Sequence, residues 1–67
     1  MVKNTIKVER AIKNLTQEEL AKLISVSRQT INSIEKNRYI PSTILALKLS
    51  KVFGKNVNEI FELENDD

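Results

Sequence analysis

Apolar residues recur along this chain at intervals of three and four positions, which is the spacing of one face of an α-helix. Alternation of β-branched and polar residues is scarce. The only Gly and the only Pro fall between the apolar-periodic segments, where such residues mark turns. The pattern therefore predicts an all-α fold, with five short helices joined by tight turns in one domain over residues 1–67.

The first two predicted helices differ in how clearly they are marked. The first runs from about residue 4 to residue 14 with imperfect periodicity, and its expected apolar residues are Ile6, Val8, Ala11, Ile12 and Leu15. Thr16 and Glu19 have the spacing of a capping box, which predicts the start of the second helix. The expected buried stripe of that helix is Leu20, Ala21, Leu23 and Ile24.

The third predicted helix follows the second almost at once. Ser27 is a favourable N-cap residue, so only Ser25 and Val26 lie between the two helices. A connection this short forces neighbouring helices to cross sharply, as they do in a helix-turn-helix unit. We expect that unit to occupy about residues 16–36.

Two further helices complete the prediction. Pro41 and Ser42 are expected to start the fourth helix, and Gly54 to end it as a C-cap. The residues expected on its core arc are Leu45, Ala46, Leu49, Val52 and Phe53. Asn56 and Glu59 repeat the capping-box spacing and predict a short last helix. Its expected apolar residues are Val57, Ile60, Phe61 and Leu63. An alternative for the termini is that residues 1–3 and 61–63 pair as short strands.

The outer face of the third helix carries short or bidentate hydrogen-bonding side chains. Turning 100° per residue from Ile31 places Ile34 beside it, toward the core. The opposite face then holds Gln29, Asn32, Ser33 and Lys36, with Arg28 beside it at the first turn. Arg can bind guanine and Gln or Asn can bind adenine bidentately in the DNA major groove. Ordinary solvation also explains many polar helix faces, so the face alone leaves both interpretations open.

Composition excludes several classes of chemistry. The chain has no Cys and no His, which removes disulfides, zinc sites of Cys/His type, a thiol nucleophile and a histidine base. No apolar stretch has the length of a signal peptide or a membrane span. We expect a soluble, cytoplasmic protein that holds no metal or cofactor.

The net charge of +2 hides an uneven distribution. Residues 1–58 hold eleven Lys and Arg against four acidic residues, and the other five acidic residues fall within residues 59–67. A basic body attracts polyanions, and an acidic tail over residues 62–67 would be repelled by them or mask the body. Lysines that only solvate helices would give the same excess, so charge alone does not decide the partner.

The run LTQEELAKLISVSRQTINSIEKNRYIPS resembles the helix-turn-helix of the xenobiotic-response-element (XRE) family, the Cro and phage-repressor type of five-helix DNA-binding domain. The match covers roughly residues 6–63, with TQEELA, VSRQTI and IE in register. It implies a sequence-specific transcriptional regulator of double-stranded DNA, more often a repressor. Such a protein binds a palindromic operator as a homodimer, with helix three of each subunit in major grooves about 34 Å apart.

The resemblance also implies roles for particular residues. The base-contacting positions are Arg28, Gln29, Asn32 and Ser33. The phosphate-contacting positions are Gln17, Lys36, Asn37, Arg38 and Tyr39. Arg10 and Glu35 match a structural ion pair of the family. No second acid, metal set or nucleophile accompanies Glu35, so we do not expect an enzyme.

Two departures from the family pattern give further expectations. Ser25 stands where Gly is usual, and we expect it to adopt positive φ at a cost of about 1 kcal/mol. Glu9 stands where relatives commonly carry an apolar residue, so helix one is expected to pack through Val8 and Ile12.

The dimer contact and a second function complete the expectations. Ile44 and Leu47 fall outside the core arc of helix four, and we expect them to form the two-fold dimer contact together with Val57, Ile60 and Phe61. The alternative function is a protein-binding module of antitoxin or anti-repressor type, whose partner would be another protein.

Overall fold

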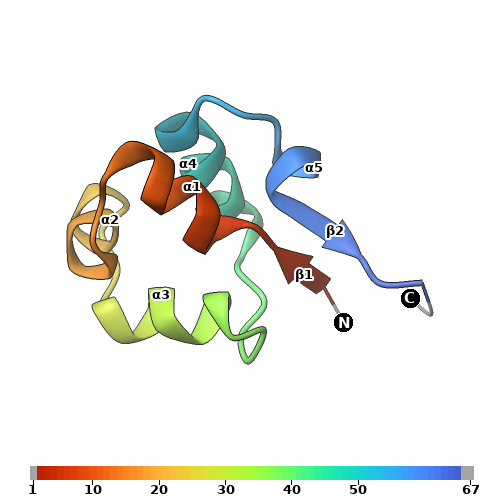
Figure 1. Ribbon diagram of the computed structural model, residues 1–67. Helices are drawn as coiled ribbons and strands as arrows, with labels where there is room; N and C mark the ends of the chain where they lie inside the picture. The colour runs from red at the N-terminus through yellow and green to blue at the C-terminus, as the bar shows by residue number, and fades with distance from the viewer. Residues whose placement is uncertain (1, 66–67) are drawn as a thin grey trace.

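The computed structural model describes residues 2–65 and places five helices and two strands within them (Figure 1). In chain order these are β1 (Val2–Asn4), α1 (Ile6–Lys13), α2 (Gln17–Leu23), α3 (Arg28–Glu35), α4 (Thr43–Phe53), α5 (Val57–Ile60) and β2 (Phe61–Leu63). The core is made of Ile6, Leu20, Ala21, Ile24, Ile31, Ile34, Leu49, Phe53 and Ile60. Every helix contributes to it, so each helix is held by tertiary packing as well as by its own hydrogen bonds.

The N-terminal ends of the helices lie close to the predicted positions because their caps are local. Thr16 Oγ1 accepts from the backbone N–H of Glu19 at 3.0 Å, and Glu19 Oε1 accepts from the backbone N–H of Thr16 at 2.9 Å, which completes a capping box. The Ser27 and Ser42 hydroxyls accept from backbone N–H groups three residues on, each at 3.2 Å. Ser42 is thus the N-cap of α4, and Pro41 lies before the helix rather than in it.

Four helices are followed, either directly or after one further residue, by a residue with left-handed backbone. These are Asn14 (φ 60°), Ser25 (φ 60°), Asn37 (φ 59°) and Gly54 (φ 65°). Each turns the chain back so that an N–H beyond the helix reaches a carbonyl of its last turn; the Val26 N–H, for example, donates to the Ala21 carbonyl at 2.9 Å. The predictions for Ser25 and Gly54 are confirmed, whereas the two Asn residues were not foreseen in this role.

The expected packing of α1 is wrong. Val8 and Ile12 are 57% and 67% exposed, and Ala11 is exposed as well. The face toward the core instead carries Ile6 together with charged side chains at i+3 and i+4. Because these charges find partners on other elements, as described below, α1 can turn its apolar residues outward.

Two smaller expectations also fail, and one is confirmed. Leu23 is 59% exposed and does not belong to the buried stripe of α2. The last helix ends at Ile60, and Phe61 and Leu63 lie in a strand instead of continuing it. In α4 the predicted arc is confirmed, since Leu49 and Phe53 are buried and its other members are partly buried.

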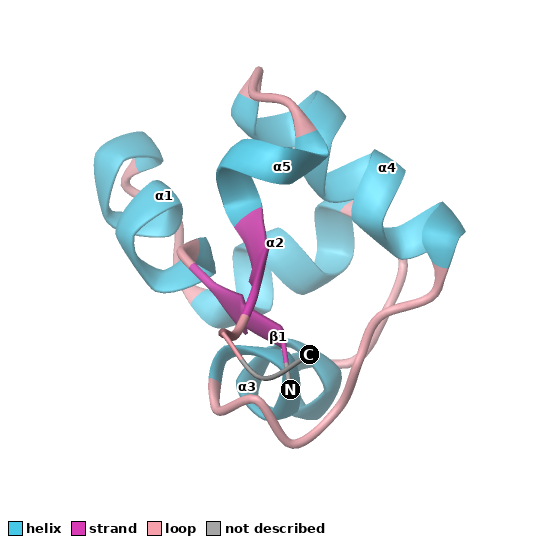
Figure 2. Cartoon of the chain, turned by 90° about the vertical axis from the view of Figure 1, so that its right-hand side faces the viewer, coloured by secondary structure: helices cyan, strands magenta, loops and turns pink. Residues whose placement is uncertain are grey.

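The termini form the two-stranded antiparallel sheet that the sequence left open. Val2 pairs with Leu63 and Asn4 with Phe61, and the Thr5 N–H donates to the Ile60 carbonyl at 2.9 Å. The first strand is displaced by one residue from the expected 1–3, and Met1 lies outside the described residues. The sheet lies beside the end of α3 (Figure 2), to which the Asn4 side chain is hydrogen-bonded.

Candidate nucleic-acid interface

The third helix divides its side chains between the core and the surface as its periodicity predicts. Ile31 and Ile34 are 0% and 1% exposed. On the other side Gln29 and Lys36 are exposed and Asn32 and Ser33 are partly buried; Arg28, at the first turn, is exposed. We call Gln29, Asn32, Ser33 and Lys36 the outward face of α3. The apolar residues hold the helix against the body and leave these polar groups free to meet a partner.

The surface beside the outward face is hollowed in two places. One hollow is lined by Ser27, Gln29, Thr30, Ser33, Arg38 and Tyr39, and the other by Gln29, Asn32, Ser33, Lys36 and Arg38. Gln29, Ser33 and Arg38 belong to both. The fold therefore brings expected base-contacting and phosphate-contacting residues onto one concave polar surface, although Arg28 lines neither hollow.

Two residues of this surface were missed in the sequence. Ser27 and Thr30 precede Ser33 at intervals of three residues, so the three form a hydroxyl stripe along one flank of α3. The Ser27 and Thr30 hydroxyl oxygens lie 3.0 Å apart, within hydrogen-bonding distance. The spacing is present in the sequence, but Ser27 also has the position of an N-cap, which explains a hydroxyl there without a binding role.

The expected ion pair between α1 and α3 is present. Arg10 Nε and Nη2 donate to Glu35 Oε2 and Oε1 at 2.6 and 3.1 Å, and Arg10 Nη1 donates to the Leu15 carbonyl at 2.9 Å. The side chains of Arg10 and Glu35 are 15% and 7% exposed. Hydrogen bonding to Glu35 raises the pKa of the Arg10 guanidinium above its ordinary value, although burial opposes the rise. The guanidinium therefore stays charged, and its two hydrogen bonds to Glu35 fix α3 to α1.

Gln17 is part of the same network. Its Nε2 donates to Glu35 Oε1 at 3.1 Å, so Glu35 accepts from both Gln17 and Arg10. Gln17 is the first residue of α2 and is partly buried. The network thus joins α1, the start of α2 and the end of α3.

A second ion pair accounts for the buried charge on α1. Glu9 is 5% exposed, and its Oε2 lies 3.0 Å from Lys55 Nζ, which follows α4. No local pattern in the sequence indicates this pair, because Lys55 is remote from Glu9 along the chain.

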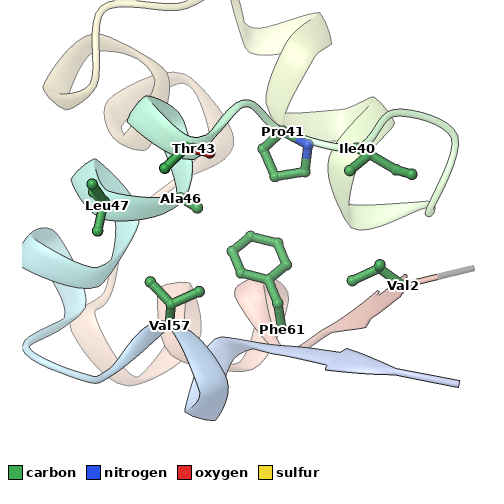
Figure 3. A pocket seen from close by; sticks show the side chains of 8 residues that line it. All are labelled: Val2, Ile40, Pro41, Thr43, Ala46, Leu47, Val57 and Phe61. Atoms are coloured by element: carbon green, nitrogen blue, oxygen red, sulfur yellow. The ribbon is translucent and has the colours of Figure 1, made fainter.

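The expected dimer residues fall into three groups. Leu47, Val57 and Phe61 line an apolar groove of about 260 Å³, together with Val2, Ile40, Pro41, Thr43 and Ala46. The Phe61 ring points from the sheet into this groove, between Val57 and Val2 (Figure 3). Ile44 is 66% exposed on α4 but does not line the groove. Ile60 is fully buried in the core, so its assignment to a surface contact is wrong.

Two other kinds of feature are missing from residues 2–65. That part of the chain contains no group of three His, Cys, Asp or Glu side chains arranged to hold a metal ion. Nor does it contain a helix long and apolar enough to cross a membrane.

Comparison with known proteins identifies the family. Residues 6–60 match the sequence profile of the helix-turn-helix family. An HTH-type transcriptional regulator of Methanocaldococcus jannaschii is 53% identical over 66 residues, covering 98% of this chain and 100% of the relative.

Two solved structures have the same fold. The SOS-response transcriptional repressor LexA of Eubacterium rectale superposes with a TM-score of 0.78 and 31% identity, covering 92% of this chain and 66% of that one. The restriction-modification controller protein C.AhdI of Aeromonas hydrophila superposes with a TM-score of 0.73 and 28% identity, covering 81% and 82%. The profile spans most of the chain and the M. jannaschii relative matches nearly all of it, so the chain belongs to the XRE-type helix-turn-helix family, whose members are DNA-binding transcriptional regulators and not enzymes.

Proposed function

We propose that this protein is a sequence-specific transcriptional repressor that binds a palindromic operator in double-stranded DNA as a homodimer. The observation that carries the proposal is the outward face of α3. Side chains of the types that bind bases project from this face, and Ile31 and Ile34 anchor the opposite side of the helix in the core. Base contacts are assigned to Arg28, Gln29, Asn32 and Ser33. Phosphate contacts are assigned to Gln17, Lys36, Asn37, Arg38 and Tyr39. Base contacts specify the sequence and phosphate contacts position the protein on it.

The network around Glu35 supports a phosphate contact by Gln17. A side-chain amide carries two N–H donors. One donates to Glu35 Oε1 at 3.1 Å, which fixes the orientation of the amide and leaves the second N–H for a DNA phosphate at the start of α2. Glu35 thus acts on DNA binding through Gln17 without touching DNA itself.

The apolar groove supports a homodimer. A two-fold contact is isologous, so the same patch on each subunit must complement itself. The groove and the neighbouring Leu47 and Ile44, which are 58% and 66% exposed, offer an apolar patch of the kind that a second copy would cover. The groove residues Ile40 and Pro41 directly follow Arg38 and Tyr39, so the dimer contact would lie next to the phosphate contacts.

A repressor needs only to occupy its operator, because occupation blocks polymerase without enzymatic activity. LexA, one of the structural relatives, is itself named as a transcriptional repressor. The proposed location is the cytoplasm, because the relatives named above come from archaea and bacteria, whose DNA lies in the cytoplasm.

Selection from a pool of random duplexes, followed by a salt titration, tests the proposal. We expect a selected sequence with two-fold symmetry and half-sites about one helical turn apart. The logarithm of affinity should fall with the logarithm of salt concentration by about 0.9 for each phosphate neutralised. Failure to retain any duplex at low salt would reject DNA binding. Capture of one protein by a chain that binds no DNA would favour the antitoxin or anti-repressor alternative.

The homodimer is tested by paired charge substitutions. Leu47→Glu places a carboxylate at the groove and should give a monomer by light scattering, with operator affinity strongly reduced. Ile12→Glu is the matched control, because Ile12 is 67% exposed on α1 and lies outside the groove. A dimer that survives Leu47→Glu and dissociates with Ile12→Glu would move the contact to α1.

A further inference from the structure

Asn4, the last residue of β1, uses its side-chain amide to join three parts of the chain. Its Nδ2 donates to the Ile34 carbonyl at 2.8 Å and to Asn37 Oδ1 at 3.0 Å, and its Oδ1 accepts from the Ile6 N–H at 3.1 Å. Both amide hydrogens are therefore used. The opposite orientation of the amide would place its oxygen against two acceptors, so the contacts determine the orientation.

The two donor bonds hold the turn that ends α3. Asn37 has left-handed backbone, with its N–H donating to the Ile34 carbonyl at 3.0 Å, and the Arg38 N–H donates to the Ser33 carbonyl at 2.9 Å. This is the double hydrogen bond of a Schellman motif. Asn4 binds the carbonyl that receives one of these bonds and also the side chain of the left-handed residue, so it braces the turn from outside.

Asn4 is itself fixed in place. Asn4 pairs with Phe61 in the sheet, and the next residue, Thr5, donates its N–H to the Ile60 carbonyl at 2.9 Å. Asn4 is partly buried and lines neither hollow beside the outward face of α3. It is therefore anchored on the body, outside those two hollows, and it lines a separate small hollow with Asn37 and Tyr39.

We propose that Asn4 is a positioning residue for DNA binding, which braces the left-handed turn at Asn37 and so holds Arg38 and Tyr39 where they meet a phosphate. This inference rests on the proposed DNA-binding function and adds a residue that acts without touching DNA. Bracing the backbone matters because a long side chain on a fixed turn loses less conformational freedom on binding than one on a loose loop.

Asn4→Asp removes the donor group of the amide and keeps its acceptor oxygen, so it tests the two groups separately. Aspartate keeps an oxygen for the Ile6 N–H, where a negative charge at the start of α1 is favourable. It has no amide hydrogens to donate and turns carboxylate oxygens toward the Ile34 carbonyl and Asn37 Oδ1. We expect operator affinity to fall about tenfold, the equivalent of one charge-assisted hydrogen bond. The slope of the salt dependence should decrease by about 0.9 for each phosphate that Arg38 no longer neutralises.

Thr5→Ala is the matched control for loss of stability at the same end of the chain. It removes the hydrogen bond from Thr5 Oγ1 to the Glu59 carbonyl at 3.4 Å and leaves the turn at Asn37 intact. A double-mutant cycle with Arg38→Ala supplies a readout that a merely structural role would not change. The cycle uses Asn4→Ala, which removes both donor bonds and adds no charge beside Arg38. If Asn4 acts through Arg38, Asn4→Ala should cost much less affinity in the Arg38→Ala background than in the wild type.

All variants are compared at a temperature where circular dichroism shows them folded. If Asn4→Asp does not fold, Asn4→Ala replaces it, because alanine brings no carboxylate repulsion. The inference is overturned if the Asn4 variant keeps the affinity and salt dependence of the wild type. Full additivity with Arg38→Ala, or an equal loss in Thr5→Ala, would also overturn it. If the wild type binds duplex DNA and Arg38→Ala weakens that binding, these outcomes reject only the role of Asn4 and leave the proposed function intact. If the wild type binds no duplex, both the role of Asn4 and the proposed function are rejected.

Discussion

Helices α1 and α3 have the same length and are joined by an ion pair, yet they use their faces in opposite ways. α3 turns Ile31 and Ile34 to the core and leaves hydrogen-bonding side chains outside. α1 turns Glu9 and Arg10 inward and leaves Val8 and Ile12 exposed. The difference shows that an apolar stripe marks the inner face of a helix only where its partners are apolar, because paired charges can occupy that face as well.

The contrast between the two helices is tested most strongly by one substitution made at two places. Ile31→Ala empties a fully buried site and should lower the free energy of unfolding by about 2–5 kcal/mol. Ile12→Ala trims a side chain that is 67% exposed and should change it by no more than about 0.5 kcal/mol. Urea denaturation measures both. Similar losses at the two positions would mean that α1 packs through its apolar residues after all.

The inward charges of α1 give the next effect. Arg10→Met leaves the Glu35 carboxylate, whose side chain is 7% exposed, without its cationic partner, and should cost about 3 kcal/mol in the same assay. Glu9→Gln is the comparison, because its partner Lys55 is 40% exposed and can turn to water. We expect that variant to lose about 1 kcal/mol or less. A larger loss for Glu9→Gln would assign the anchoring of α1 to the Lys55 pair.

The same contrast explains how much of the fold could be predicted. The starts of α2, α3 and α4 were predicted because Thr16, Ser27 and Ser42 each cap backbone N–H groups in the first turn of the helix that follows them. The inner face of α1 was not, because Glu9 depends on Lys55, and the two meet only in the folded chain. The sequence did not decide whether the termini form a sheet, for a related reason. A strand of three residues is too short to show periodicity, and each strand forms only by pairing with the other.

The candidate site shows the same limit. The outward face of α3 followed from the 100° periodicity of one helix. The hydrogen bonds that support the end of α3 could not be predicted in this way, because they come from Asn4, which is remote from α3 along the chain. Asn37 carried a usable local signal, since Asn just beyond the C-cap of a helix is a common alternative to Gly in left-handed backbone.

The turn that presents α3 should be improved by glycine. Ser25 has φ 60°, so Ser25→Gly should relieve about 1 kcal/mol of strain and raise the melting temperature by about 4–8 °C. Asn14→Gly should gain less, because Asn tolerates left-handed backbone better than Ser. Operator preference should stay unchanged in both. A melting temperature that does not rise in Ser25→Gly would show that the turn is not strained.

The smallest effect concerns the capping box of α2. Backbone and side-chain hydrogen bonds with Thr16 lower the pKa of the Glu19 carboxyl below its ordinary value of 4.5. A lowered pKa in the folded state adds stability above the unfolded pKa, and that stability is lost as the pH falls through the lowered value. Thermal unfolding of Glu19→Gln should therefore depend less on pH below 4.5 than the wild type does. An identical pH dependence would contradict the capping role of the carboxylate.

The most direct measurement of the central claim compares operator selection by Arg28→Ala and Gln17→Ala. If the first turn and outward face of α3 contact bases, Arg28→Ala should relax the preference at one base pair of each half-site, at a cost of about 1–3 kcal/mol. Gln17→Ala should weaken all sequences similarly and keep the selected operator, because it removes a phosphate contact. Altered base preference in Gln17→Ala, with the operator unchanged in Arg28→Ala, would contradict the account.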